Sequence, residues 1–119
     1  MQIYLFILLI HFLADFGLQT HEQATKKGLG NSLYNGSLFQ HVGVYSMVWL
    51  IALLTISTDI PNVLGITILI FFTHYLTDWI TSRIGKSFWD KGDYHNGFVV
   101  VGFDQLVHYI TLFYIFKLL

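Results

Sequence analysis

The fold of this chain is indicated first by residues 63–82, which read VLGITILIFFTHYLTDWITS. A helix of about 20 mainly apolar residues crosses a bilayer, and this stretch has that length and character. It nevertheless contains His74 and Asp78, which lie four positions apart and therefore on one helix face. A charged carboxylate in the bilayer core costs about 2.5–3.5 kcal/mol, so its presence there indicates a function.

Three further stretches have the same character, residues 1–18, 41–57 and 97–118. Residues 1–18 lack the basic start and the small-residue cleavage site of a signal peptide and contain Asp15, so we expect a retained helix. Pro61 marks a tight turn between the second and third stretches. We therefore predict an all-α integral membrane protein, in which residues 1–119 form a single transmembrane four-helix bundle.

The composition agrees with a membrane protein and argues against other classes. The chain is 55% hydrophobic and 11% charged, whereas soluble domains carry about 25% charged residues. A net charge of -1 argues against a nucleic-acid partner, which requires a basic surface. The absence of cysteine excludes disulfides and thiolate metal ligands. Membrane lipid is the expected partner, and the sequence leaves the oligomeric state open.

The orientation follows from the basic residues. The polar connections 19–40 and 83–96 share one side of a four-span chain and hold most of them: Lys26, Lys27, Arg83, Lys86 and Lys91. Only Lys117 lies on the opposite side. Because basic residues stay in the cytoplasm, both termini are expected on the non-cytoplasmic side of a multi-pass protein.

The ionisable residues of the expected helices come in pairs. His11 and Asp15, His74 and Asp78, and Asp104 and His108 are each four positions apart, whereas random placement gives roughly 0.6 such pairs. At about 1.5 Å per residue, they and His41 fall in one layer, roughly 0–17 Å below the cytoplasmic boundary. We therefore expect all four helices to contribute to one site.

This layer has the composition of a divalent metal site. The candidate ligands are His11, Asp15, His41, His74, Asp78, Asp104 and His108. Mixed imidazole and carboxylate ligands favour Zn²⁺, with Mn²⁺ or Fe²⁺ as alternatives. Helix bundles build two-metal sites from such paired ligands, so the site is expected to hold one or two ions.

Residues near these ligands are candidates for supporting roles. Gln19 and Gln105 lie close in sequence and are expected to orient the ligands or bind substrate. Lys27 and Arg83 are most simply topology determinants, with attraction of a substrate phosphate as the functional interpretation. The three tryptophans are expected at lipid or the interface, and Gly43, Gly65 and Gly102 at close helix contacts.

The ordered motifs resemble a known membrane family. They are His11-Phe12-Leu13-Ala14-Asp15-Phe16-x-x-Gln19, Lys26-Lys27, His41, His74-x-x-x-Asp78 and Asp104-Gln105-x-x-His108. Over nearly the whole chain they resemble an uncharacterised bacterial and phage membrane family, domain of unknown function 3307. The resemblance implies location in the bacterial inner (cytoplasmic) membrane and a bacterial or phage-encoded chain.

A more distant resemblance concerns the H-x-x-x-D pairs. They are similar to those of membrane-bound metal-dependent hydrolases, and through these to zinc-dependent phospholipase C and P1-type nucleases. This resemblance implies metal binding at the seven candidate ligands and cleavage of phosphate esters. The chain departs from the soluble enzymes in its smaller size, and it lacks their loops and their N-terminal Trp ligand.

The sequence thus favours an intramembrane metal-dependent hydrolase, a phosphoesterase acting on a lipid or lipid-linked substrate at the cytoplasmic leaflet. Asp15, Asp78 or Asp104 would act as the catalytic base when not engaged as a ligand. The alternative is a small metal-ion or proton transport module that uses the same cluster. Two other interpretations explain the paired acids less well. In one, the His and Asp side chains only hydrogen-bond between helices and stabilise their packing. In the other, the chain is a structural phage protein such as a holin.

Overall fold

The computed structural model describes residues 2–119, which fold into helices and short connections. The elements are α1 (Gln2–Phe12), a π-helical turn η1 (Leu13–Gly17), α2 (His21–Lys26), α3 (Gly36–Leu54), α4 (Ile60–Trp89), α5 (Tyr94–Ile115) and a 3₁₀ turn η2 (Phe116–Leu118). Three segments are long and apolar enough to cross a membrane, namely Gly36–Leu54, Ile60–Trp89 and Tyr94–Leu118. The expected helix at residues 1–18 is the shorter segment Gln2–Gly17, and Met1 lies outside the described residues.

The long helices extend further than their apolar stretches suggested. α3 begins at Gly36 rather than residue 41, because the Asn35 side chain accepts a hydrogen bond from the Leu38 amide and caps the helix. α4 runs seven residues past the expected end at Ser82, and a Lys86–Asp90 ion pair lies at its polar end. Polar residues end an apolar stretch without ending a helix, so only residues 90–93 connect α4 to α5.

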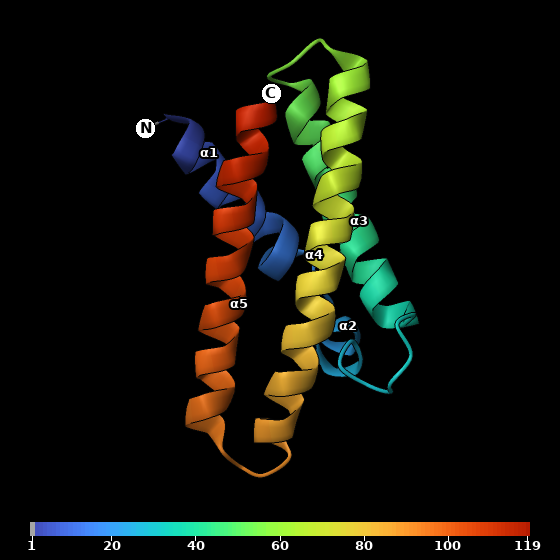
Figure 1. Ribbon diagram of the computed structural model, residues 1–119, viewed down its shortest axis with the longest axis vertical. Helices are drawn as coiled ribbons and strands as arrows, with labels where there is room; N and C mark the ends of the chain where they lie inside the picture. Colours follow the sequence, from blue (N-terminus) through green and yellow to red (C-terminus); the bar gives the residue numbers. More distant parts are fainter. Residues whose placement is uncertain (1) are drawn as a thin grey trace.

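The helices lie side by side along the longest dimension of the molecule, with α4 packed against both α3 and α5 (Figure 1). The two chain ends and the α3–α4 connection lie at one end, and the α4–α5 connection lies at the other (Figure 1). α1 packs against α3 and α5 and stops part-way along them. The short α2 then continues beside the other half of α3. The capping box of Thr20 and Gln23, which the sequence analysis missed, starts α2.

The π-helical turn falls where the chain carries its first buried carboxylate. The Leu18 amide bonds the Leu13 carbonyl five residues back, at 3.0 Å, which widens the helix at Asp15. Both Ala14 and Asp15 are buried there. Turns of this kind occur mostly at functional sites, because they redirect one side chain without ending the helix.

The buried face of α4 divides the molecule into two halves. Its buried residues follow at spacings of three and four, first Val63, Ile66 and Ile70, then His74, Asp78 and Thr81. The apolar half belongs to a core that also contains Ile7, Tyr45, Trp49, Leu53, Leu112 and Ile115. The outward faces remain apolar, with residues such as Phe72 and Leu76 exposed. An apolar exterior around a partly polar interior is the pattern expected in lipid.

Two expectations about packing were wrong. Trp49 faces the core rather than lipid, with an exposed fraction of 0%, and packs against Phe6 and Phe116. A Cβ atom at Gly43, Gly65 or Gly102 would meet nothing within 4 Å among the described residues. Close approach occurs instead where Gly28 meets the Ser82 carbonyl and where Gly97 meets the Trp89 ring, since a Cβ atom added at either glycine would lie 2.8 Å from that neighbour.

Candidate metal centre

The structure brings all seven expected ligand residues together in one buried cluster. His11 and Asp15 come from α1 and η1, His41 from α3, His74 and Asp78 from α4, and Asp104 and His108 from α5. Each of these seven side chains is buried. The three pairs spaced by four positions are in contact, with separations of 3.5 Å in the first two and 3.2 Å in the last. The expected layer is therefore a single cluster built by four segments of the chain.

Four donor atoms in this cluster lie close enough together to share one ion. They are His41 Nε2, His74 Nε2, Asp15 Oδ1 and Asp78 Oδ2, and five separations among them lie between 3.0 and 3.5 Å. Zinc binds imidazole nitrogen and carboxylate oxygen at about 2.0–2.1 Å, which corresponds to a tetrahedron with edges of about 3.3–3.4 Å. The donor types and the five separations are therefore close to those around a tetrahedral divalent ion, and the buried group could hold one. We call it the four-donor position.

A second group of donors lies beside the first. Asp15, Asp104 and His108 each offer an atom within 4.8 Å of the others. Asp15 belongs to both groups, so its carboxylate would be a ligand to an ion at either position. Three protein donors leave a coordination place free, as in catalytic metal sites. We call this group the three-donor position.

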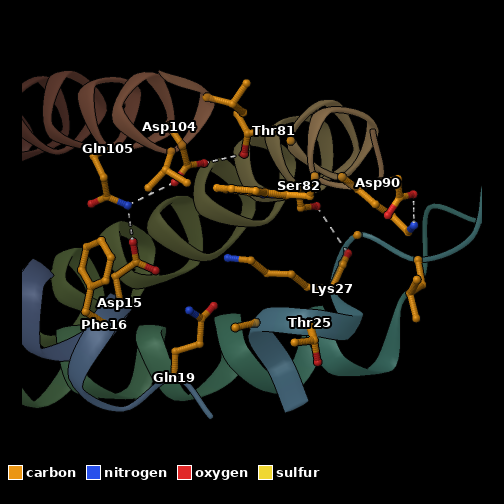
Figure 2. A pocket seen from close by; sticks show the side chains of 18 residues that line it. Asp15, Phe16, Gln19, Thr25, Lys27, Thr81, Ser82, Asp90, Asp104 and Gln105 are labelled. Atoms are coloured by element: carbon orange, nitrogen blue, oxygen red, sulfur yellow. Dashed lines mark hydrogen bonds and ion pairs between the residues drawn. The ribbon is translucent and has the colours of Figure 1, made fainter. Parts of the chain in front are cut away.

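His11 belongs to neither group, contrary to its expected role as a ligand. Its Nδ1 accepts a hydrogen bond from the Tyr45 hydroxyl at 2.7 Å, and its Nε2 donates to Gln105 Oε1 at 2.8 Å. Both ring nitrogens are therefore engaged. The Gln105 amide in turn donates to Asp15 Oδ2 at 2.8 Å and to Asp104 Oδ2 at 3.1 Å (Figure 2). His11 thus orients the amide that holds two carboxylates.

Tyr45 and Thr81 are site residues that the sequence analysis missed. Tyr45 stacks on the His74 ring with centroids 3.8 Å apart, besides its bond to His11. The Thr81 hydroxyl donates to Asp104 Oδ1. Tyr45 follows His41 by four positions and Thr81 follows Asp78 by three, so both lie on the same helix faces as those ligands. Examination of the positions one helical turn beyond His41 and Asp78 would have identified both residues from the sequence.

A cavity of about 610 Å³ leads from the cluster toward the α4–α5 connection. Asp15, Asp104 and Gln105 lie at one end of it (Figure 2), and Lys86, Trp89 and Asp90 line its other part. Its wall mixes polar groups with apolar ones, among them Phe16, Leu29, Trp89, Val100 and Val101. Gln19 also lines it, and Gln19 Oε1 is buried without a hydrogen-bond partner among residues 2–119. The cavity is suited to a ligand with both polar and apolar parts.

Lys27 reaches into this cavity from the connection after α2. Figure 2 shows its side chain extending toward Asp15. Its ammonium group donates to Asp78 Oδ2 at 3.0 Å, and its side chain is 17% exposed. Burial lowers the pKa of Lys27, but the carboxylates of Asp78 and Asp15 outweigh that effect and hold the pKa above its ordinary value. Lys27 therefore stays charged at neutral pH.

Arg83 does not line the cavity in the described part of the chain, unlike the other expected substrate-binding residues Gln19, Lys27 and Gln105. Its guanidinium group donates to the carbonyls of Leu29, Gly30 and Ser32 and lies 4.0 Å above the Trp79 ring. The planar fork of arginine suits several carbonyls at once. Arg83 thus fastens the connection that carries Lys27 onto α4.

The chain matches the family model described as protein of unknown function DUF3307 over residues 3–119. It belongs to this family. The resemblance of the ordered motifs to domain of unknown function 3307 is thereby confirmed over residues 3–119. No curated protein and no solved structure matches it.

Proposed function

We propose that this DUF3307 protein is a membrane-embedded, metal-dependent phosphoesterase that acts on a lipid or lipid-linked substrate at the cytoplasmic leaflet of a bacterial inner membrane. The observation that carries the proposal is the cavity, which joins a buried set of metal-type donors to a wall that is partly basic and partly apolar. A phosphorylated lipid has the matching chemistry, with an anionic group joined to an apolar body. Such a substrate reaches the site without leaving the membrane surface.

The surface supports a transmembrane four-helix bundle with both termini on the non-cytoplasmic side. Lys86 lies in the last turn of α4, and Lys91 lies in the α4–α5 connection. Arg83 binds the connection that follows Lys26 and Lys27, one turn before Lys86. Lys117 lies in η2 near the C-terminus. The excess of basic residues marks the cytoplasmic end. The Gln2–Gly17 segment enters from the opposite side and ends at the level of the site, supported by α3 and α5.

The donor groups supply a rationale for metal-dependent chemistry. A divalent ion, Zn²⁺ by donor type with Mn²⁺ or Fe²⁺ as alternatives, would polarise a phosphoryl oxygen and increase the acidity of water. Asp15, His41, His74 and Asp78 would hold one ion, and Asp15, Asp104 and His108 a second. Three buried carboxylates without a cation would carry a high free-energy cost, which such ions offset.

Asp104 is the best-placed base among the three carboxylates. It lines the cavity and is 8% exposed, whereas Asp78 lies deeper and is 1% exposed. Thr81 and Gln105 hold its two oxygens in place. In the proposed step, Asp104 would hold the second ion through one oxygen and accept a proton from the attacking water at the other. The bond between phosphorus and the ester oxygen breaks as water attacks phosphorus, and the leaving oxygen takes that proton. Lys27 and Gln19 orient the phosphate group.

The second candidate function is a metal-ion or proton transport module built on the same cluster. The packing beyond the cluster favours the enzyme, because Tyr45, Trp49, Ile70 and Leu112 fill the interior toward the chain ends. A conduit needs polar groups or water along that path. The cavity reaches the cluster from the opposite end.

Metal analysis of the detergent-purified protein tests the proposal first. We expect at least one divalent ion per chain in the wild type, and loss of that ion in His74→Ala and Asp78→Ala. His95→Ala and Glu22→Gln are matched controls, because both side chains are exposed and lie outside the cluster. Wild-type protein free of metal after purification without chelators would rule out the metal-dependent function.

Reconstituted vesicles separate the two candidate functions. A phosphoesterase hydrolyses a phosphate ester of a lipid in proteoliposomes, and this hydrolysis stops in His74→Ala. A lipid monoester then releases inorganic phosphate, and a diester releases its phosphorylated headgroup. A transporter instead moves the divalent ion or protons across sealed vesicles without changing the lipid. Metal-dependent flux together with unchanged lipid would replace the enzyme by the transport module.

A further inference from the structure

Lys27 is the positive group that the chain itself supplies to the cluster. Its ammonium group bonds Asp78 Oδ2, one of the atoms of the four-donor position. Lys26 next to it points outward and pairs with Glu22, with a side chain 54% exposed. The two neighbouring lysines therefore have different roles.

The structure fixes Lys27 in this place by contacts on both sides of its backbone. A Cβ atom added at Gly28 would lie 2.8 Å from the Ser82 carbonyl oxygen, so the connection lies directly on α4. Trp79 donates to the Ser32 carbonyl at 3.0 Å, and Arg83 binds carbonyls nearby. The Asn35 side-chain amide donates to the carbonyls of Lys26 and Leu29. A lysine held in this way is part of the site's permanent charge.

The charges of the cluster then limit how many ions it holds. Three carboxylates contribute three negative charges, Lys27 contributes one positive charge, and the histidines are neutral when they bind metal. One divalent ion makes the sum zero. A second divalent ion leaves two excess positive charges in a buried site, which is unfavourable unless an anion accompanies it. A phosphate monoester carries about -1.5 to -2 charges at pH 7 and restores neutrality.

We propose that Lys27 limits the resting site to one ion and makes binding of a second ion depend on a phosphate monoester dianion. The four-donor position is filled at rest, since its geometry is complete. The three-donor position opens toward the cavity and fills together with the phosphate. This inference rests on the proposed function and narrows its substrate to phosphate monoesters over diesters, which carry one negative charge.

Ion counting with and without a non-hydrolysable anion tests the inference. Purified protein is dialysed against micromolar Zn²⁺ alone, with methylphosphonate at a pH above its second pKa, where it is a dianion, or with dimethyl phosphate as a monoanionic diester. We expect one bound ion per chain with Zn²⁺ alone, two with methylphosphonate and one with dimethyl phosphate. Two ions bound to the wild type without an anion would overturn the inference. One bound ion in the presence of methylphosphonate would also overturn it. This arm needs no variant.

Lys27→Met tests the lysine itself, because it removes the charge and keeps an apolar side chain. We expect it to bind the second ion without an anion, with an affinity at least about tenfold above that of the wild type. Lys26→Met is the matched control and should behave as the wild type. An unchanged affinity for the second ion in Lys27→Met would overturn the role of Lys27.

Failure of this inference differs from failure of the proposed function. The inference alone is refuted if the wild type hydrolyses the lipid but the number of bound ions changes neither with methylphosphonate nor in Lys27→Met. If the number of bound ions changes with methylphosphonate and in Lys27→Met, but no phosphate ester is hydrolysed, the phosphoesterase is refuted. The dependence of the second ion on the anion then still holds. Protein that binds no ion under any condition refutes both.

Discussion

Asp15 Oδ1 lies 3.0 Å from His41 Nε2, although 26 positions separate the two residues in sequence. The second oxygen of the same carboxylate accepts a hydrogen bond from Gln105, on α5. One side chain of the first helical segment therefore connects the donors of α3 and α4 with those of α5. The π-helical turn places Asp15 in this central position.

Asp15→Asn should weaken both metal positions, because Asp15 is the residue that they share. We expect metal affinity to fall by more than about 100-fold, since loss of an outer-shell partner alone costs about 10–100-fold. Metal titration of the purified variant measures the effect. Glu22→Gln serves as the control for removal of a carboxylate at the surface. Wild-type affinity in Asp15→Asn would exclude a shared ligand.

Gly28→Ala should destabilise the protein and displace Lys27, because the new Cβ would lie 2.8 Å from a backbone oxygen of α4. We expect a loss of about 1–3 kcal/mol, as for other overpacked positions. Thermal unfolding in detergent measures it. Gly43→Ala is the matched control: its Cβ meets nothing within 4 Å in the described chain, and it should gain about 0.5–1 kcal/mol within a helix. Equal effects at the two glycines would contradict the close contact.

Tyr45→Phe should destabilise the cluster without changing the number of ions bound. The variant leaves His11 Nδ1 buried without its hydrogen-bond partner, which costs about 1–3 kcal/mol. Denaturant unfolding measures the stability, and metal analysis gives the ion count. Tyr94→Phe, at an exposed position, should leave both unchanged. Loss of an ion in Tyr45→Phe would instead give the tyrosine a more direct role in metal binding.

Arg83→Lys should loosen the connection that carries Lys27, because an ammonium group cannot bind three carbonyls and stack on Trp79 in the same way. We expect amide hydrogen exchange at residues 28–33 to rise about tenfold, the effect of about 1.4 kcal/mol in local opening. Lys91→Arg in the α4–α5 connection is the control. Unchanged exchange in Arg83→Lys would show that other contacts hold this segment.

The helices and their ligand pairs could be predicted because both depend on local spacing. An apolar stretch of bilayer length predicts a helix, and a spacing of four positions puts His74 and Asp78 on one face whatever surrounds them. The helix ends were harder to predict from the sequence, because they depend on capping residues such as Asn35 and Asp93 rather than on hydropathy. Trp49 was misplaced for a similar reason, since an apolar ring packs equally well against lipid and against a core.

The sequence by itself determined that imidazoles and carboxylates share one layer of an apolar helical protein. Only the tertiary structure decided which of them face one another. It places His41, His74, Asp15 and Asp78 close enough to share one ion, engages both nitrogens of His11 elsewhere, and brings Lys27 inside while Arg83 stays outside. The physical reason is that a helix face fixes the direction of a side chain only relative to its own axis. The rotation and depth of neighbouring helices, set by packing over the whole chain, decide which donor atoms meet.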